Sequence, residues 1–195
     1  MTNKTAIHTY LSQEFHFSDL EIARMRYACI TILSETSKIL FLFLAFYLLH
    51  MQTEFLIAAA VLLSIRNFTG GIHLAHYTTC LAFSFLFLLF AILLSRHVAV
   101  SAGLQIFIMG IGAITICRIG GVSSDRRPDP SPKKEFFFKT IACLLLLVYI
   151  TLFLCVKNLP QKNLIFWVIV LQIMQLAAAK YMKERRTHNE DQKNQ

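Results

Sequence analysis

Residues 55–65, Phe-Leu-Ile-Ala-Ala-Ala-Val-Leu-Leu-Ser-Ile, and residues 81–95, Leu-Ala-Phe-Ser-Phe-Leu-Phe-Leu-Leu-Phe-Ala-Ile-Leu-Leu-Ser, are two runs without a charged side chain. They are too apolar to face water. The whole chain shares this character, since 56% of its 195 residues are hydrophobic and its mean hydropathy is +0.57. Soluble domains are typically ~45–50% apolar. The sequence therefore predicts an all-α, polytopic integral membrane protein.

Six apolar runs predict about six transmembrane helices. The runs cover residues 39–49, 55–65, 81–95, 102–117, 136–156 and 164–179. All but the run 136–156 are shorter than the ~20 residues that usually cross a bilayer, and the first helix is expected to begin further back, near Ala28. Short spans are also expected to leave irregular backbone at membrane depth, which is tolerated where it is buried in protein or lines a wet cavity.

The two ends of the chain differ from this apolar middle. Residues 1–26 carry apolar side chains among polar ones at roughly helical spacing, which predicts amphipathic helices on the membrane surface, with a solvated leader as the alternative. Residues 27–179 are expected to form the transmembrane bundle of a single membrane domain. Residues 180–195 are polar and charged, and a disordered cytoplasmic tail is expected there.

The distribution of Lys and Arg predicts the orientation. With the N-terminus inside, 16 of the 19 basic residues fall on the inner side, and only Arg96, Lys157 and Lys162 fall in the outer connections. This asymmetry predicts that both termini face the cytoplasm. The net charge of +8 is spread between apolar runs and not over one soluble face, so nucleic acid is excluded in favour of membrane lipids or an acidic partner.

Between the two quoted runs lies the segment Arg66-Asn-Phe-Thr-Gly-Gly-Ile-His-Leu-Ala-His-Tyr-Thr-Thr-Cys80. A cysteine beside imidazole and guanidinium groups suits covalent acyl transfer, because such neighbours favour the nucleophilic thiolate. Zinc is a rival reading, but the segment holds no carboxylate and no fourth ligand, so no metal is expected. The plain alternative is that Cys80 is a small core side chain.

Two histidines compete for the role of base. On one continuous helix, His76 and Cys80 share a face, with ~5–6 Å between their Cβ atoms. His73 lies two turns from Cys80, about 10 Å along such a helix. Spacing alone therefore favours His76. The pair Gly70-Gly71 allows the backbone to leave helical geometry, which would change this result.

A basic segment, residues 123–135, contains three of the four prolines of the chain. Proline at this density predicts extended, exposed chain. One interpretation is a docking surface for an acidic or lipid-bound partner; the other is a cytoplasmic loop whose charges fix the topology. The candidate docking residues are Arg126, Arg127, Lys133 and Lys134. A homodimer is also predicted, because Gly103, Gly110 and Gly112 allow close helix packing, although they serve packing within one bundle equally well.

The pattern Arg-x-x-x-Gly-Gly-x-His-x-x-x-x-x-x-Cys, at Arg66, Gly70, Gly71, His73 and Cys80, resembles the signature of the AgrB family. These are the accessory gene regulator membrane endopeptidases of Gram-positive quorum sensing. The chain length, the hydrophobic profile and the basic proline-containing loop are also similar to that family. The resemblance implies a cysteine endopeptidase that cuts a small AgrD-like propeptide, holds one part as a thioester, and releases it as a cyclic thiolactone or lactone.

The same resemblance implies roles for individual residues. Cys80 is the nucleophile and His73, not His76, is the base, with Arg66, Gly70 and Gly71 in support. Glu35 matches a glutamate of the first hydrophobic region and is expected to orient His73. The acidic end of the propeptide would meet the basic segment, and no cofactor is expected. The competing hypothesis is a small peptide transporter with a discontinuous helix at Gly70-Gly71.

Overall fold

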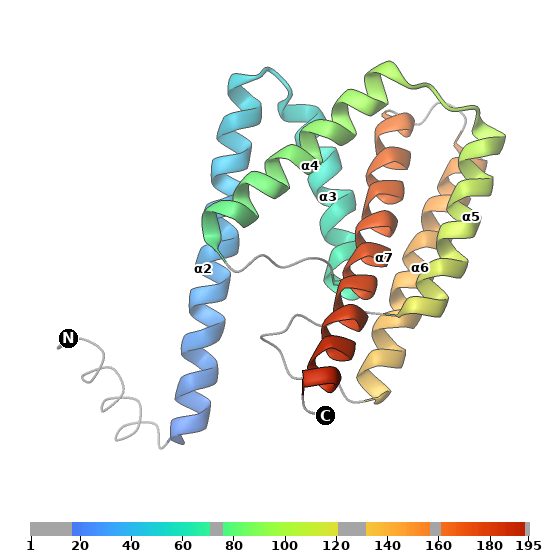
Figure 1. Ribbon diagram of the computed structural model, residues 1–195. Coiled ribbons are helices and arrows are strands. Elements are labelled where there is room, and N and C mark those ends of the chain that lie inside the picture. Colours follow the sequence, from blue (N-terminus) through green and yellow to red (C-terminus); the bar gives the residue numbers. More distant parts are fainter. Residues whose placement is uncertain (1–16, 71–75, 121–131, 157–160, 194–195) are drawn as a thin grey trace. The chain divides into compact units, whose positions relative to one another are not determined.

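The computed structural model describes residues 17–70, 76–120, 132–156 and 161–193. These residues form six α-helices, which confirms the all-α prediction (Figure 1). The helices are α2 (Asp19–Leu48), α3 (Gln52–Thr69), α4 (Tyr77–His97), α5 (Ala102–Ile119), α6 (Pro132–Cys155) and α7 (Lys162–Lys193). The chain divides into two compact units, Met1–Ala45 and Phe46–Gln195.

Five of these helices, α2 and α4 to α7, are long and apolar enough to cross a membrane. The sixth, α3, has 18 residues but carries Glu54 and Arg66 near its ends. The expectation of a short span is wrong for α4, because polar residues at both ends extend it beyond its apolar run to 21 residues, whereas α3 and α5 have 18 residues each. Backbone hydrogen bonding continues through these polar residues, so hydropathy alone underestimates helix length.

Helix α2 begins at Asp19, earlier than the predicted start near Ala28. The cause is a capping box. The Glu21 N–H donates to Ser18 Oγ at 3.4 Å, the Ser18 N–H donates to Glu21 Oε2 at 2.9 Å, and the Ser18 carbonyl accepts the first helical bond. Residues 19–26 therefore belong to the first long helix and are not a separate surface helix. Residues 1–16 lie outside the described ranges.

Within the unit Phe46–Gln195, α7 packs against α3, α4 and α5, and α6 packs against α3 and α5 (Figure 1). Gly112 allows the approach of α5 to α7, since a Cβ at that position would overlap the end of the Ile173 side chain. This glycine therefore serves packing within one chain, whereas Gly103 and Gly110 have open space around them. The homodimer stays a prediction that the particle mass in mild detergent and in nanodiscs would test.

Polar side chains join the helices at the end of the bundle away from the candidate motif. Asn163 Nδ2 donates to the carbonyls of Ser95 at 2.6 Å and Val98 at 2.8 Å, and Trp167 Nε1 donates to the Val98 carbonyl at 3.1 Å. These bonds satisfy carbonyls at the C-terminus of α4. The start of α7 is thereby tied to the end of α4.

Two expectations about loops need correction. The sequence predicts extended chain over residues 123–135, but α6 begins at Pro132. Proline is compatible with the first turn of a helix, because the N–H that it lacks has no acceptor there. The tail was expected to be disordered, but α7 continues to Lys193. Its polar residues extend a helix that the bundle has already nucleated.

Candidate active site

Helix α3 ends where the sequence predicts a break. Gly70 has φ 73° and ψ −153°, and its N–H donates to the Arg66 carbonyl at 2.8 Å. This backbone conformation is essentially restricted to glycine, because a Cβ would clash with the neighbouring peptide group. The prediction that the glycine pair lets the chain leave helical geometry is confirmed at Gly70. Gly71 and His73 lie outside the described residues.

Helix α4 begins only at Tyr77, so the motif is not one continuous helix. His76 precedes α4 with extended backbone, φ −101° and ψ 140°, and its carbonyl accepts the Cys80 N–H at 3.1 Å. The geometry that favoured His76, a helical face shared with Cys80, is therefore wrong. The physical reason is the pair of helix ends, at Gly70 and at His76, that separates α3 from α4.

Cys80 lies in the first turn of α4 and is 6% exposed. Of the five cysteines it is the buried one; Cys143 is half-buried, and Cys29, Cys117 and Cys155 are exposed. Burial keeps water from a reactive sulfur, which a thioester requires. Because α4 starts at Tyr77, the N–H groups of Thr78 and Thr79 have no acceptor within the helix. A helix N-terminus with such donors stabilises negative charge.

Arg66 occupies the last turn of α3 and is half-buried. Its carbonyl receives the Gly70 N–H, so Arg66 takes part in ending the helix through its backbone. The guanidinium belongs to the same short segment as the Gly70 turn. The sequence-based role of this side chain, binding an oxyanion or a substrate carboxylate, stays a prediction.

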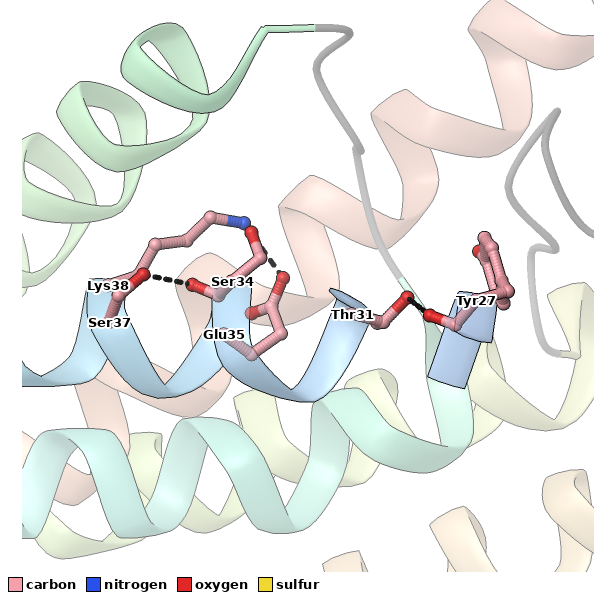
Figure 2. A network of polar contacts seen from close by, with 6 residues as sticks. All are labelled: Tyr27, Thr31, Ser34, Glu35, Ser37 and Lys38. Atoms are coloured by element: carbon pink, nitrogen blue, oxygen red, sulfur yellow. Dashed lines mark hydrogen bonds and ion pairs between the residues drawn. The ribbon is translucent and has the colours of Figure 1, made fainter. Parts of the chain in front are cut away.

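Glu35 lies on α2 in a chain of local polar contacts (Figure 2). Its Oε1 accepts a hydrogen bond from Lys38 Nζ at 2.8 Å, and the Glu35 side chain is 51% exposed. In the same turn, Ser37 Oγ donates to the Ser34 carbonyl, and one turn earlier Thr31 Oγ1 donates to the Tyr27 carbonyl. The structure thus gives Glu35 a cationic partner on its own helix; orientation of His73 by Glu35 stays a prediction.

Two of the four predicted docking residues are described. Lys133 and Lys134 lie in the first turn of α6 and are exposed. Arg126 and Arg127 lie outside the described residues. Over the parts of the chain that the structure describes, no three His, Cys, Asp or Glu side chains gather as metal ligands.

The sequence analysis missed two buried glutamines on α7, Gln172 and Gln175, which are 1% and 6% exposed. Gln172 Nε2 donates to the Gly70 carbonyl at 3.0 Å and to Thr69 Oγ1 at 3.3 Å. The available signal was a pair of amides inside the otherwise apolar run 164–179, since polar side chains are costly at membrane depth. The hydrogen bonds of Gln172 to the end of α3 gave no local signal in the sequence.

The comparisons with known proteins identify the family of this chain. The model of the family described as accessory gene regulator B matches residues 5–176, which include the whole motif and all of α2 to α6. The chain belongs to this AgrB family. It is also similar to a putative AgrB-like protein of Clostridium beijerinckii, with 29% identity over 162 residues, covering 82% of this chain and 78% of that protein. No solved structure matches the chain. The family and the five apolar helices identify a multi-pass membrane protein of the accessory gene regulator system.

Proposed function

We propose that this protein is a membrane cysteine endopeptidase that processes a small AgrD-like propeptide for quorum sensing. One observation carries the proposal: the motif breaks between Gly70 and Tyr77, which places Cys80 in the first turn of a membrane-spanning helix, buried and beside backbone donors that have no acceptor within that helix. Membership of the AgrB family supports the same reading. A thiol at a helix N-terminus next to a histidine-bearing segment suits acyl transfer.

The first step forms an acyl-enzyme. His73 accepts the Cys80 proton, and the sulfur attacks the carbonyl carbon of the scissile peptide bond. Because the Gly70 N–H is already paired with the Arg66 carbonyl, the first-turn N–H groups of Thr78 and Thr79 are better placed to stabilise the oxyanion. When the C–N bond breaks, the leaving amine takes the proton from His73. The remaining peptide stays on Cys80 as a thioester.

The second step closes the ring. A Cys or Ser side chain of the bound peptide attacks the thioester carbonyl, and the Cys80 thiol is regenerated. A thioester and a thiolactone have similar energies, so exchange succeeds only where water is kept away. The burial of Cys80 supports this requirement. Lys133 and Lys134, with Arg126 and Arg127, are proposed to attract the acidic end of the propeptide.

The proposal is tested with purified protein in liposomes and the propeptide. The expected result is a protein mass increased by one propeptide fragment, an increase that hydroxylamine removes because it cleaves thioesters. Free C-terminal fragment should accumulate in step with this adduct. Intact peptide delivered across the bilayer, with no adduct and no fragment, would contradict the peptidase and support the transporter.

The proposed orientation places both termini and Cys80 at the cytoplasmic face, as the charge asymmetry predicts, and it requires α3 to cross the membrane in addition to the five helices α2 and α4 to α7. Because Cys80 is buried, exposed positions test this better. In a chain without its native cysteines, Ala99→Cys, in the connection after α4, should react with an impermeant maleimide on intact cells. Arg185→Cys, on α7, should react only after permeabilisation. The reverse pattern would reject this orientation.

The Gly70 turn allows a prediction with an internal control. Gly120 ends α5 in nearly the same conformation, φ 72° and ψ −160°, and its N–H donates to the Ile116 carbonyl. Alanine at either glycine should therefore cost a similar ~1–3 kcal/mol of stability. Only Gly70→Ala should slow iodoacetamide alkylation of Cys80, on the order of 10²-fold, because only that turn leads into the motif.

The measurements are thermal unfolding and the alkylation rate of a chain that keeps Cys80 as its sole cysteine. Alkylation is used because it does not depend on propeptide docking, which residues near Gly120 could affect. Equal slowing in both glycine variants would show that general destabilisation, and not the Gly70 turn, controls Cys80.

A further inference from the structure

We propose that Gln172 is a positioning residue for the active site: from α7, it holds the Gly70 carbonyl and so fixes the point at which the chain leaves α3 towards His73. The inference rests on the proposed function, because it assigns a role within the same site. Gln172 itself is not part of the family motif, and the inference depends on its contact with Gly70, which lies 102 residues away in the sequence.

The hydrogen bonds define how the Gln172 amide is oriented. Its NH₂ group donates to the Gly70 carbonyl at 3.0 Å and to Thr69 Oγ1 at 3.3 Å. Thr69 Oγ1 in turn donates to the Ile65 carbonyl at 3.1 Å, with the Gly70 carbonyl as a more distant acceptor at 3.4 Å, so its lone pairs are available to accept from Gln172. Both neighbours of the amide nitrogen act as acceptors, and only an NH₂ group with two hydrogens satisfies both at once.

The Gly70 carbonyl needs such a partner. The last carbonyls of a helix receive no N–H from within it, and Gly70, the C-cap of α3, has a non-helical conformation. Inside a membrane protein an unpaired carbonyl is costly, because no bulk water replaces the lost bond. Gln172, which is 1% exposed, supplies the bond from the interior of the bundle.

The position of Gln172 on a well-packed helix makes its bond to the Gly70 carbonyl, here called the Gln172 anchor, a rigid one. Helix α7 packs against α3, α4 and α5, and the residues next to Gln172 on the inner face of α7, Ile169 and Leu176, are fully buried. The Gly70 carbonyl is thereby tied to the most buried membrane-spanning helix described. His73 follows three residues later in the sequence, so the role proposed for Gln172 is to fix the conformation of Gly70, from which the chain continues towards His73.

Gln175 provides a matched control. It lies one turn further along α7 and is 6% exposed, but neither Oε1 nor Nε2 has a hydrogen-bond partner, and no bond reaches the end of α3 from it in the described structure. Both glutamines can be replaced by methionine, which has a similar shape and no amide. Any difference between the two variants then reports the bonds to Thr69 and Gly70.

The experiment compares Gln172→Met with Gln175→Met. The Gly70 N–H is bonded to the Arg66 carbonyl, and losing the Gln172 bond to the Gly70 carbonyl makes this turn easier to open. In Gln172→Met, hydrogen–deuterium exchange of the Gly70 amide should therefore be about five- to tenfold faster. Alkylation of a sole Cys80 should fall at least about tenfold, and its pH profile should shift towards that of an unassisted thiol. Gln175→Met should leave both measurements unchanged. Identical behaviour of the two variants would overturn the proposal.

A second pair guards against a folding defect in Gln172→Met. Thr69→Val removes one of the two acceptors of the amide, whereas Thr69→Ser keeps the hydroxyl. Hydrogen–deuterium exchange of the Gly70 amide should be faster in the valine variant and stay at the wild-type rate in the serine variant. Equal exchange rates in the two variants would count against the Gln172 anchor. If the wild-type protein did not cleave propeptide, the proposed peptidase function would be rejected. The exchange rates of the Gly70 amide would still test the Gln172 contact, because they do not depend on cleavage.

Discussion

Cys80→Ser is expected to abolish propeptide cleavage, with a loss of about 10³-fold or more in turnover. A serine hydroxyl at this position is a weak nucleophile, because the imidazole that suffices for a thiol does not ionise a much less acidic hydroxyl. The thioester adduct should vanish completely, and no mass increase that hydroxylamine removes should remain. Propeptide cleavage is measured by mass spectrometry of the released C-terminal fragment.

Two other cysteines serve as controls. Cys117 and Cys155 are exposed at the ends of α5 and α6, so Cys117→Ser and Cys155→Ser should retain cleavage. Thermal unfolding of Cys80→Ser should be close to that of the wild type, since the two side chains have nearly the same shape. If Cys80→Ser cleaved normally while binding propeptide, Cys80 would be an ordinary core residue and the transporter reading would gain support.

Apolar runs predicted the helices well but not their boundaries. The runs identify which segments are buried in lipid or protein, whereas helix ends are set by local backbone chemistry. Ser18 and Glu21 start α2 through a capping box, and Pro132 starts α6 because its ring is compatible with a first turn. The capping residues and the proline are visible in the sequence, but the hydropathy of a segment does not depend on them.

Some features of the candidate site follow from local sequence, and others depend on contacts between distant segments. The break at Gly70 was predictable, because two adjacent glycines are sufficient reason for a helix to end. The bond from Gln172 to the Gly70 carbonyl was not, since it joins segments 102 residues apart and leaves no periodic pattern. The motif therefore indicated where the chain turns, and the fold was needed to show what holds the turn.

The break also bears on the choice of base. In one unbroken helix, His76 and Cys80 would lie on the same face, but His76 lies before α4 and its side chain is exposed. Its described contact with Cys80 is through the backbone, where the His76 carbonyl accepts the Cys80 N–H at 3.1 Å. Alanine at position 76 keeps this carbonyl, and no side-chain cap is lost because the His76 side chain makes none.

His73→Ala is therefore expected to abolish both propeptide cleavage and alkylation of Cys80 near neutral pH, whereas His76→Ala should retain most of each. An unassisted thiol has a pKa of ~8.5 and is mostly protonated at pH 7, so alkylation in His73→Ala should recover only as the pH rises past that value. The measurement is the alkylation rate of a sole Cys80 between pH 6 and about 9.5, a range that brackets the unassisted thiol. A loss confined to His76→Ala would mean that the exposed imidazole reaches the thiol across the start of α4. Alkylation at the wild-type rate in both variants would remove these two histidines from the mechanism and leave Cys80 without a base.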